Sequence, residues 1–303
     1  MLRDKVTEFF VEMDDFCKEF ATQLENRPLL VDTAVKRRNR KGRLSDSEMM
    51  SIYLLFHFGQ FTNFKHFYTQ YVCKHLDDLF PDLISYVRFN ARQERILFPL
   101  MLYLKYRGLG KSRGINYIDS TLLRVCHIKR EKQHQVFKGI AEKGKSTMGW
   151  FFGFKLHLII NDKGELLSFY LTKGNVDDRN IELMTAMTKD VFGKLFGDKG
   201  YISKALSELL FQDGIQLITK VRKNMKKQNL SDVDAILLRK RALVESVNDE
   251  LKNICKVEHT RHRSVKGFLV NLIAGLTAYC FFPKKPSLNI TPIETNQLCL
   301  WAA

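Results

Sequence analysis

After Gly114 the chain alternates between short apolar runs typical of strands and longer segments with helical periodicity. Three strand-like runs come first: INYIDSTLLRVC, FFGFKLHLIIND and ELLSFYLTKGN. The turn Asn161-Asp162-Lys163-Gly164 suits a hairpin, so we expect these strands to be antiparallel. The segments that follow predict a helix over 181–191, a strand at KLFGD, a helix over 203–212, a strand at IQLITKV and a long helix over 231–254. This order predicts an α/β fold with a sheet flanked by helices.

The net charge of the chain indicates which classes of binding partner to expect. Forty-nine Lys and Arg against 33 Asp and Glu give a formal charge of +16 and a pI near 9.5. Such a field attracts polyanions, so nucleic acid is the first candidate partner. A membrane partner is not expected, because the sequence has no run of about eighteen apolar residues and its first residues, MLRDKVTEFF, do not form a signal peptide. We expect a soluble intracellular protein.

Residues 1–110 have a helical pattern. The stretch 4–24 is amphipathic, and Ser45 with Glu48 forms a capping box for a second helix. A break at 59–63 separates that helix from the apolar and aromatic segment FKHFYTQYV. A basic run precedes the second helix and supplies candidate DNA contacts: Lys36, Arg37, Arg38, Arg40, Lys41 and Arg43. The pattern fits a helix-turn-helix reader of DNA, and it fits equally a helical bundle with a solvated charged loop.

Two aspartates lie in or beside predicted strands. Asp119 interrupts the apolar run GINYIDSTLL, where a carboxylate is costly unless a metal ion or hydrogen bonds compensate it. Asp198 ends KLFGD between Gly197 and Gly200, which would allow a DNA strand to approach the backbone closely. Simple turns at strand ends are the alternative for both residues. Lys199, next to Asp198, is a further candidate contact to DNA.

A third acid lies in the predicted helix RALVESVNDELK. Arg241, Glu245 and Lys252 are four and seven residues apart, which leaves net rotations of roughly +40° and −20° at about 100° per residue. All three side chains therefore share one face, with an acid between two bases. This face suits a metal-bound phosphate flanked by further phosphates, although a solvated helix with an i,i+4 ion pair has the same spacing.

A second basic segment precedes this helix. Its positive residues outnumber the acids Asp232 and Asp234. The bases are Lys220, Arg222, Lys223, Lys226, Lys227, Arg239, Lys240 and Arg241. We interpret them as phosphate contacts near the site, with a solvated loop and helix face as the alternative.

The segments YIDST, FGDKGY and RALVESVNDELK resemble, in order, the first Asp, second Asp and Glu-helix motifs of DDE-type insertion-sequence transposases with a ribonuclease H-like catalytic domain. The resemblance runs over about 117–279 and includes GWFFGFKLHLIIN and EHTRHRS. Arg241, Glu245 and Lys252 match the intervals of the Tyr-Arg-Glu-Lys signature found in many members. Leu238 stands at the Tyr position, so no contact is transferred to it.

The resemblance implies a mixed ribonuclease H-like sheet with three antiparallel strands followed by two parallel ones. It places a catalytic domain at 111–285, after an all-helical DNA-binding domain at 1–110. A loosely ordered tail at 286–303 completes the predicted organisation.

The function implied is DNA transposition: binding of the element's ends, metal-dependent strand cleavage and strand transfer. Asp119, Asp198 and Glu245 would be the catalytic residues and hold two Mg²⁺ or Mn²⁺ ions, since hard cations prefer oxygen ligands. Arg241 and Lys252 would hold adjacent phosphates. The expected partner is double-stranded DNA, as terminal inverted repeats and target, bound by a homodimer in the bacterial cytoplasm at the nucleoid. A nuclease of the same fold without strand transfer and an inactive DNA-binding derivative are the alternatives; the latter would be expected to lack an acid, and all three are present.

Overall fold

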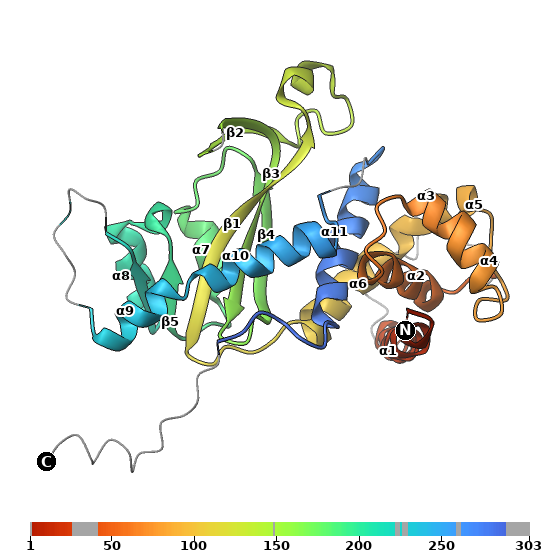
Figure 1. Ribbon diagram of the computed structural model, residues 1–303, viewed down its shortest axis with the longest axis horizontal. Coiled ribbons are helices and arrows are strands. Elements are labelled where there is room, and N and C mark those ends of the chain that lie inside the picture. The colour runs from red at the N-terminus through yellow and green to blue at the C-terminus, as the bar shows by residue number, and fades with distance from the viewer. Residues whose placement is uncertain are drawn as a thin grey trace, which may run out of the picture.

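The computed structural model describes residues 2–25, 42–147, 149–221, 225, 230–258 and 262–288. A sheet flanked by helices forms one half of the molecule and a helical region forms the other (Figure 1). Several predicted features lie outside the described residues: Lys36, Arg37, Arg38, Arg40 and Lys41 of the first basic run, Arg222, Lys223, Lys226 and Lys227 of the second, and most of the C-terminal tail.

The sheet is built around β1 (Ile115–Cys126). On one side β1 pairs antiparallel with β3 (Gly149–Asn161), which pairs antiparallel with β4 (Leu166–Lys173). On the other side β1 pairs parallel with β5 (Gly193–Gly197), which pairs parallel with β6 (Ile215–Thr219). The predicted arrangement of three antiparallel and two parallel strands is confirmed, and the fold is ribonuclease H-like.

A further strand, β2 (Glu142–Ser146), was not predicted. It pairs antiparallel with the first residues of β3, from Gly149 to Gly153, while β4 pairs with the rest of that strand from Phe154 onward. Its sequence, EKGKS, lacks the apolar alternation of a strand with one buried face. Only its pairing with the long β3 makes it a strand.

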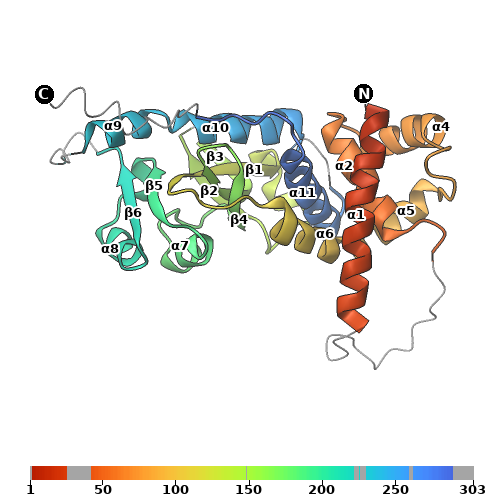
Figure 2. The same cartoon turned by 90° about the horizontal axis from the view of Figure 1, so that it is seen from below.

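Helices cover both faces of the sheet, with α9 and α10 on one side and α7 and α8 on the other (Figure 2). On the first side α10 (Ala242–Asp249) packs against β1. On the other, α7 (Ile181–Thr188) and α8 (Lys204–Gln212) bury Leu183 and Leu206 in one cluster with Ile118. Alternate residues of β1 thus enter two different cores, as strand geometry requires.

The prediction of one helix over 231–254 is wrong. The segment forms α9 (Asp232–Arg239), α10 and the π-helical turn η7 (Glu250–Ile254), with Lys240 and Arg241 between the first two. No Gly or Pro marks the break. Packing explains it, because α9 lies against β5 and β6 while α10 follows β1, and a twisted sheet gives these strands different directions.

The N-terminal region is helical. The predicted capping box of α2 (Asp46–Phe58) is confirmed, since the side chains of Ser45 and Glu48 each accept a hydrogen bond from the other's backbone N–H. Residues 49–57 of α2 are buried without interruption, so this helix cannot itself lie in a DNA groove. Around it lie α1 (Leu2–Glu25), α3 (Phe64–His66), η2 (Phe67–Val72), α4 (Cys73–His75), α5 (Tyr86–Arg92), η3 (Gln93–Ile96), α6 (Leu97–Tyr103) and η4 (Leu104–Gly108).

The last helix, α11 (Val265–Cys280), joins the two halves of the molecule. It packs against α2 and α6, and its side chains share one apolar cluster with residues from α1, α2 and the sheet. His57 of α2 is completely buried at this junction, and its Nδ1 lies 2.6 Å from the carbonyl oxygen of Cys255.

Among the described helices, none has the length and apolar character needed to cross a membrane.

Candidate active site

The two aspartates are brought together by the pairing of β1 with β5. Their parallel ladder ends at the pair Tyr117 and Phe196; Asp119 lies two residues further along β1, and Asp198 lies two residues after Phe196, directly after β5 ends. Because side chains alternate along a strand, Asp119 and Asp198 continue the face that Tyr117 and Phe196 share. That is the face covered by α10. The geometry therefore sets both carboxylates at one level of the sheet, where β5 ends and β1 continues.

Asp119 lies in a polar contact between β1 and α10. Its Oδ2 accepts a hydrogen bond of 3.0 Å from Nδ2 of Asn248, and its Oδ1 lies 3.6 Å from Nη1 of Arg241. The side chain is only 20% exposed. Burial raises the pKa of Asp119 to about 7, Arg241 opposes that rise, and the carboxylates of Asp198 and Glu245 add to it.

Asp198 begins the short turn η6 (Lys199–Tyr201), where its Oδ1 accepts a 2.7 Å hydrogen bond from the backbone N–H of Gly200. A Cβ on Gly200 would lie 2.8 Å from that oxygen, and one on Gly197 would lie 3.2 Å from both Ile118 and the Tyr201 ring. Both glycines thus serve local packing. Close approach of DNA is not needed to explain them.

Glu245 lies on α10 and contacts Arg241. Its side chain is 56% exposed and forms an ion pair with Arg241 at the start of the helix. Arg241 thus contacts both Asp119 and Glu245 with one guanidinium group. Within the described part of the chain, no three His, Cys, Asp or Glu side chains meet in an arrangement ready to hold a metal ion. The position of Arg241 between two of the acids gives a physical reason.

Lys252 contacts β1 further along the sheet. It lies in the π-helical turn η7, its Nζ donates a 2.6 Å hydrogen bond to the carbonyl oxygen of Leu122, and it pairs with Glu258 at 3.1 Å. Glu258 also accepts a 3.0 Å hydrogen bond from the backbone N–H of Arg124. Arg241 and Lys252 therefore both contact β1. The phosphate contact expected of Lys252 remains a prediction.

Lys199 and Lys220 are exposed just after the ends of β5 and β6. The carboxyl ends of parallel strands meet at one edge of a sheet, so both lysines belong to the edge that carries Asp198.

Asn248 is a site residue that sequence reasoning missed. It is buried on α10 and donates to Asp119. Asn248 follows Glu245 by three residues and Arg241 by seven, so the helical spacing used for those two residues places it on the same side of the helix. The helical spacing therefore carried a signal for Asn248, which charge alone does not reveal.

The sheet order, with one acid on β1 and another directly after β5, defines a ribonuclease H-like domain. Residues 109–265, more than half of the chain, match the transposase DDE domain family. The chain belongs to this family. Membership implies the use of divalent metal ions.

A solved structure is similar to most of the chain. This cryo-EM structure of the piggyBac transposase synaptic complex with hairpin DNA matches over 90% of this chain and 72% of that chain, with 12% identity and a TM-score of 0.45. No curated protein matches the chain.

Proposed function

We propose that this protein is a transposase that binds the ends of its mobile element, cuts DNA and joins the freed end to target DNA. The observation that carries the proposal is the placement of Asp119 and Asp198 two residues beyond the last β1–β5 pair, on the face that α10 crosses with Glu245. Neighbouring carboxylates of this kind suit divalent cations, which are bound mainly by oxygen.

The donor set fits such ions. Asp119, Asp198 and Glu245 would hold them, and a buried carboxylate whose pKa is raised by burial and by two other acids gains most from a bound cation. When bound, a pair of ions would stabilise the attacking and leaving oxygens of an in-line displacement at a phosphodiester. Asn248 would keep the Asp119 carboxylate oriented through its hydrogen bond.

Arg241 has to change partner for this site to work. Its guanidinium group now neutralises Asp119 and Glu245, in the region where cations would bind. A phosphate beside the scissile bond offers the guanidinium a better charged partner than a partly exposed glutamate, because guanidinium and phosphate can form paired hydrogen bonds. DNA binding would thus draw Arg241 to the backbone and leave both carboxylates available.

The DNA path we propose crosses the sheet edge that carries Lys199 and Lys220 and continues along α10 to Lys252. Terminal inverted repeats and target DNA would be held in turn, by a homodimer that pairs two ends, in the bacterial cytoplasm at the nucleoid. Phosphate contacts from these lysines and from the basic segment around Arg222 and Lys223 would make binding fall steeply with salt.

The experiment compares wild-type protein with Asp119→Asn on duplex DNA carrying the element's own ends, with Mg²⁺. Wild-type protein should nick the end, and the variant should bind it with unchanged affinity and leave it intact. Retained nicking by Asp119→Asn would contradict the assignment. Absence of nicking by wild-type protein would favour an inactive DNA-binding derivative.

Strand transfer needs a separate assay with a pre-cut end and a target plasmid. Joined products that depend on Asp119, Asp198 and Glu245 would support a transposase. Cleavage without any joined product would identify a nuclease of the same fold instead.

A further inference from the structure

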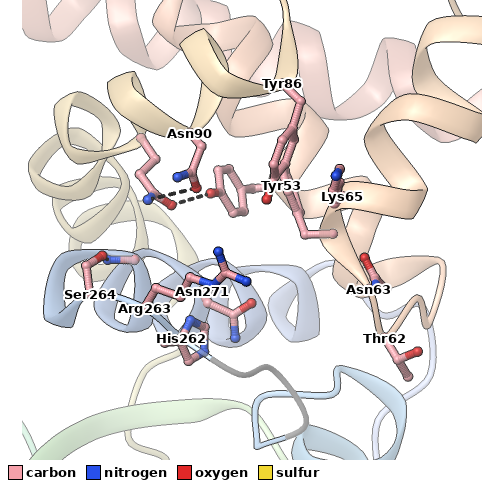
Figure 3. A pocket seen from close by; sticks show the side chains of 13 residues that line it. Tyr53, Thr62, Asn63, Lys65, Tyr86, Asn90, His262, Arg263, Ser264 and Asn271 are labelled. Atoms are coloured by element: carbon pink, nitrogen blue, oxygen red, sulfur yellow. Dashed lines mark hydrogen bonds between the residues drawn. The ribbon is translucent and has the colours of Figure 1, made fainter. Parts of the chain in front are cut away.

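A cavity of about 710 Å³ lies between the N-terminal helices and the start of α11 (Figure 3). We propose that this cavity binds a single nucleotide unit with an unpaired base. The inference rests on the proposed function, in which the nucleotide belongs to a DNA strand. The volume falls within the range of about 300–1,000 Å³ typical of small-molecule pockets, and is sufficient for a base, a sugar and a phosphate.

The charged residues that line the cavity favour an anionic ligand. Lys65 from α3 and Arg263 just before α11 line opposite sides of the cavity, and both are exposed to solvent. No acidic side chain is among the described residues that line it. In Figure 3 the Arg263 side chain extends from the α11 side toward Tyr53 and Asn90. The lining therefore presents two positive groups to a phosphate.

A chain of hydrogen bonds prepares one wall to recognise a base edge. The hydroxyl of Tyr53 donates to Oε1 of Gln93 at 2.8 Å, and Nε2 of Gln93 donates to Oδ1 of Asn90 at 3.1 Å. Because Oδ1 of Asn90 accepts that bond, its Nδ2 is the group left to donate to a ligand. Amides that present fixed donors and acceptors suit the edge of a nucleobase.

The opposite wall adds a buried imidazole. Nε2 of His262 is buried and has no hydrogen-bond partner within the described chain. Burial lowers the pKa of His262 to about 4, so the ring is neutral at pH 7 and can either donate or accept. Leaving such a nitrogen unsatisfied is costly, and because the atom is itself buried, a bound polar molecule would satisfy it only after a shift of the His262 ring.

An aromatic ring is available to stack on a base. The ring of Tyr53 already stacks on the ring of Phe64, with ring centroids 4.5 Å apart and planes at 18°. Tyr86 lines the same cavity from α5 and remains partly exposed. A base stacked on Tyr86 would lie between the amide wall and the two cations, and such stacking tolerates any base because each has a π face.

The segment EHTRHRS supplies part of the cavity wall. Its last three residues, His262, Arg263 and Ser264, line the cavity. Ser264 caps α11 by accepting a 3.0 Å hydrogen bond from the backbone N–H of Gly267. A Cβ on Gly267 would lie 3.2 Å from Nε2 of Gln93, so the glycine lets α11 approach the amide wall closely.

The experiment measures fluorescence anisotropy of a labelled single-stranded oligonucleotide of four thymidines, without divalent metal, on the full chain. Tyr86→Ala and Arg263→Gln should each weaken binding about 10-fold, the loss expected from one stacked base or one charged contact. The matched controls are Tyr106→Ala, which removes an equal ring that is 71% exposed outside the cavity, and Lys189→Gln, which removes an equal charge from an exposed site. Both controls should bind within about twofold of wild-type protein.

Unchanged affinity in Tyr86→Ala and Arg263→Gln would overturn the proposal, as would equal losses in the controls. Asn90→Ala, an exposed substitution, replaces Tyr86→Ala if the latter has a reduced melting temperature.

A competition experiment identifies whether the bound nucleotide is free or part of a strand. Displacement by thymidine monophosphate as readily as by unlabelled oligonucleotide indicates a free nucleotide, and weaker displacement indicates a strand. Equal displacement by inorganic phosphate would refute base recognition. Asp119→Asn should bind the oligonucleotide normally, so a failure of nicking and a failure of this cavity are distinguishable.

Discussion

Replacing Asp119 with asparagine exchanges a buried acid for a neutral amide of nearly the same shape. The side-chain oxygen that accepts from Asn248 is retained, while the ion pair with Arg241 is lost. Because burial and two neighbouring acids oppose ionisation of Asp119, we expect the metal-free variant to be more stable than wild-type protein above pH 7 and about equally stable at pH 4.

The magnitude follows from the pKa of Asp119. Its value of about 7 in the fold exceeds the ordinary value of 3.8, so the folded state binds more protons than the unfolded state between these pH values. Wild-type stability therefore falls as pH rises through this window. A difference of about three pKa units corresponds to about 4 kcal/mol. The attraction of Arg241 is already included in this difference, since it opposes the rise in the pKa of Asp119.

Thermal melts in EDTA at pH 4.5 and pH 8 test this reasoning. At pH 8 the variant should melt several degrees above wild-type protein, since 1 kcal/mol shifts the midpoint by about 2–4 °C in a protein of this size class. Asp190→Asn, at an exposed position, removes the same charge without burial and should show no such pH dependence. A gain for Asp119→Asn that is equal at both pH values would refute the argument.

Two further outcomes follow from the structure. Gly153→Ala should cost about 3 kcal/mol of unfolding free energy in a urea titration, because its Cβ would lie 2.0 Å from the carbonyl oxygen of Leu123 on the paired strand; an unchanged midpoint would contradict this. Burial lowers the pKa values of His57, His157 and His262 to about 4 from 6.5, so stability present above pH 6.5 should be lost as pH falls toward 4. Allowing for the opposing proton on Asp119, the slope should reach about 3 kcal/mol per pH unit, and a flat stability profile between pH 6.5 and 4.5 would disagree.

The positions of the strands could be predicted from the sequence because each strand of the central sheet carries its own apolar signal, and their arrangement in the sheet followed from the resemblance to ribonuclease H-like transposases. Asp119 and Asp198 were candidates because an acid next to such a signal is unusual, and the resemblance to DDE transposases gave them their expected roles. β2 could not be predicted from the sequence, because its stability comes from pairing with β3 and not from its own polar residues. The break between α9 and α10 at Lys240 and Arg241 could not be predicted either, because it results from the twist of strands that are distant in the chain.

The contacts of Arg241 were only half predictable. Helical periodicity placed Arg241 beside Glu245, and the structure adds Asp119, which is more than 120 residues away. The cavity next to α11 was not predictable, because its walls come from Tyr53, Asn90 and Arg263, which share no local pattern. Such surfaces depend on how whole elements pack.

The packing of α11 against α2 also affects the order in which the molecule is completed. Residues 49–57 of α2 form a buried core, yet part of the covering layer is a helix that begins at Val265. During synthesis, the ribosome must add some 200 residues after α2 before that layer exists. The first hundred residues therefore expose apolar surface during this time, and the N-terminal region reaches its final form only after the central sheet has been made.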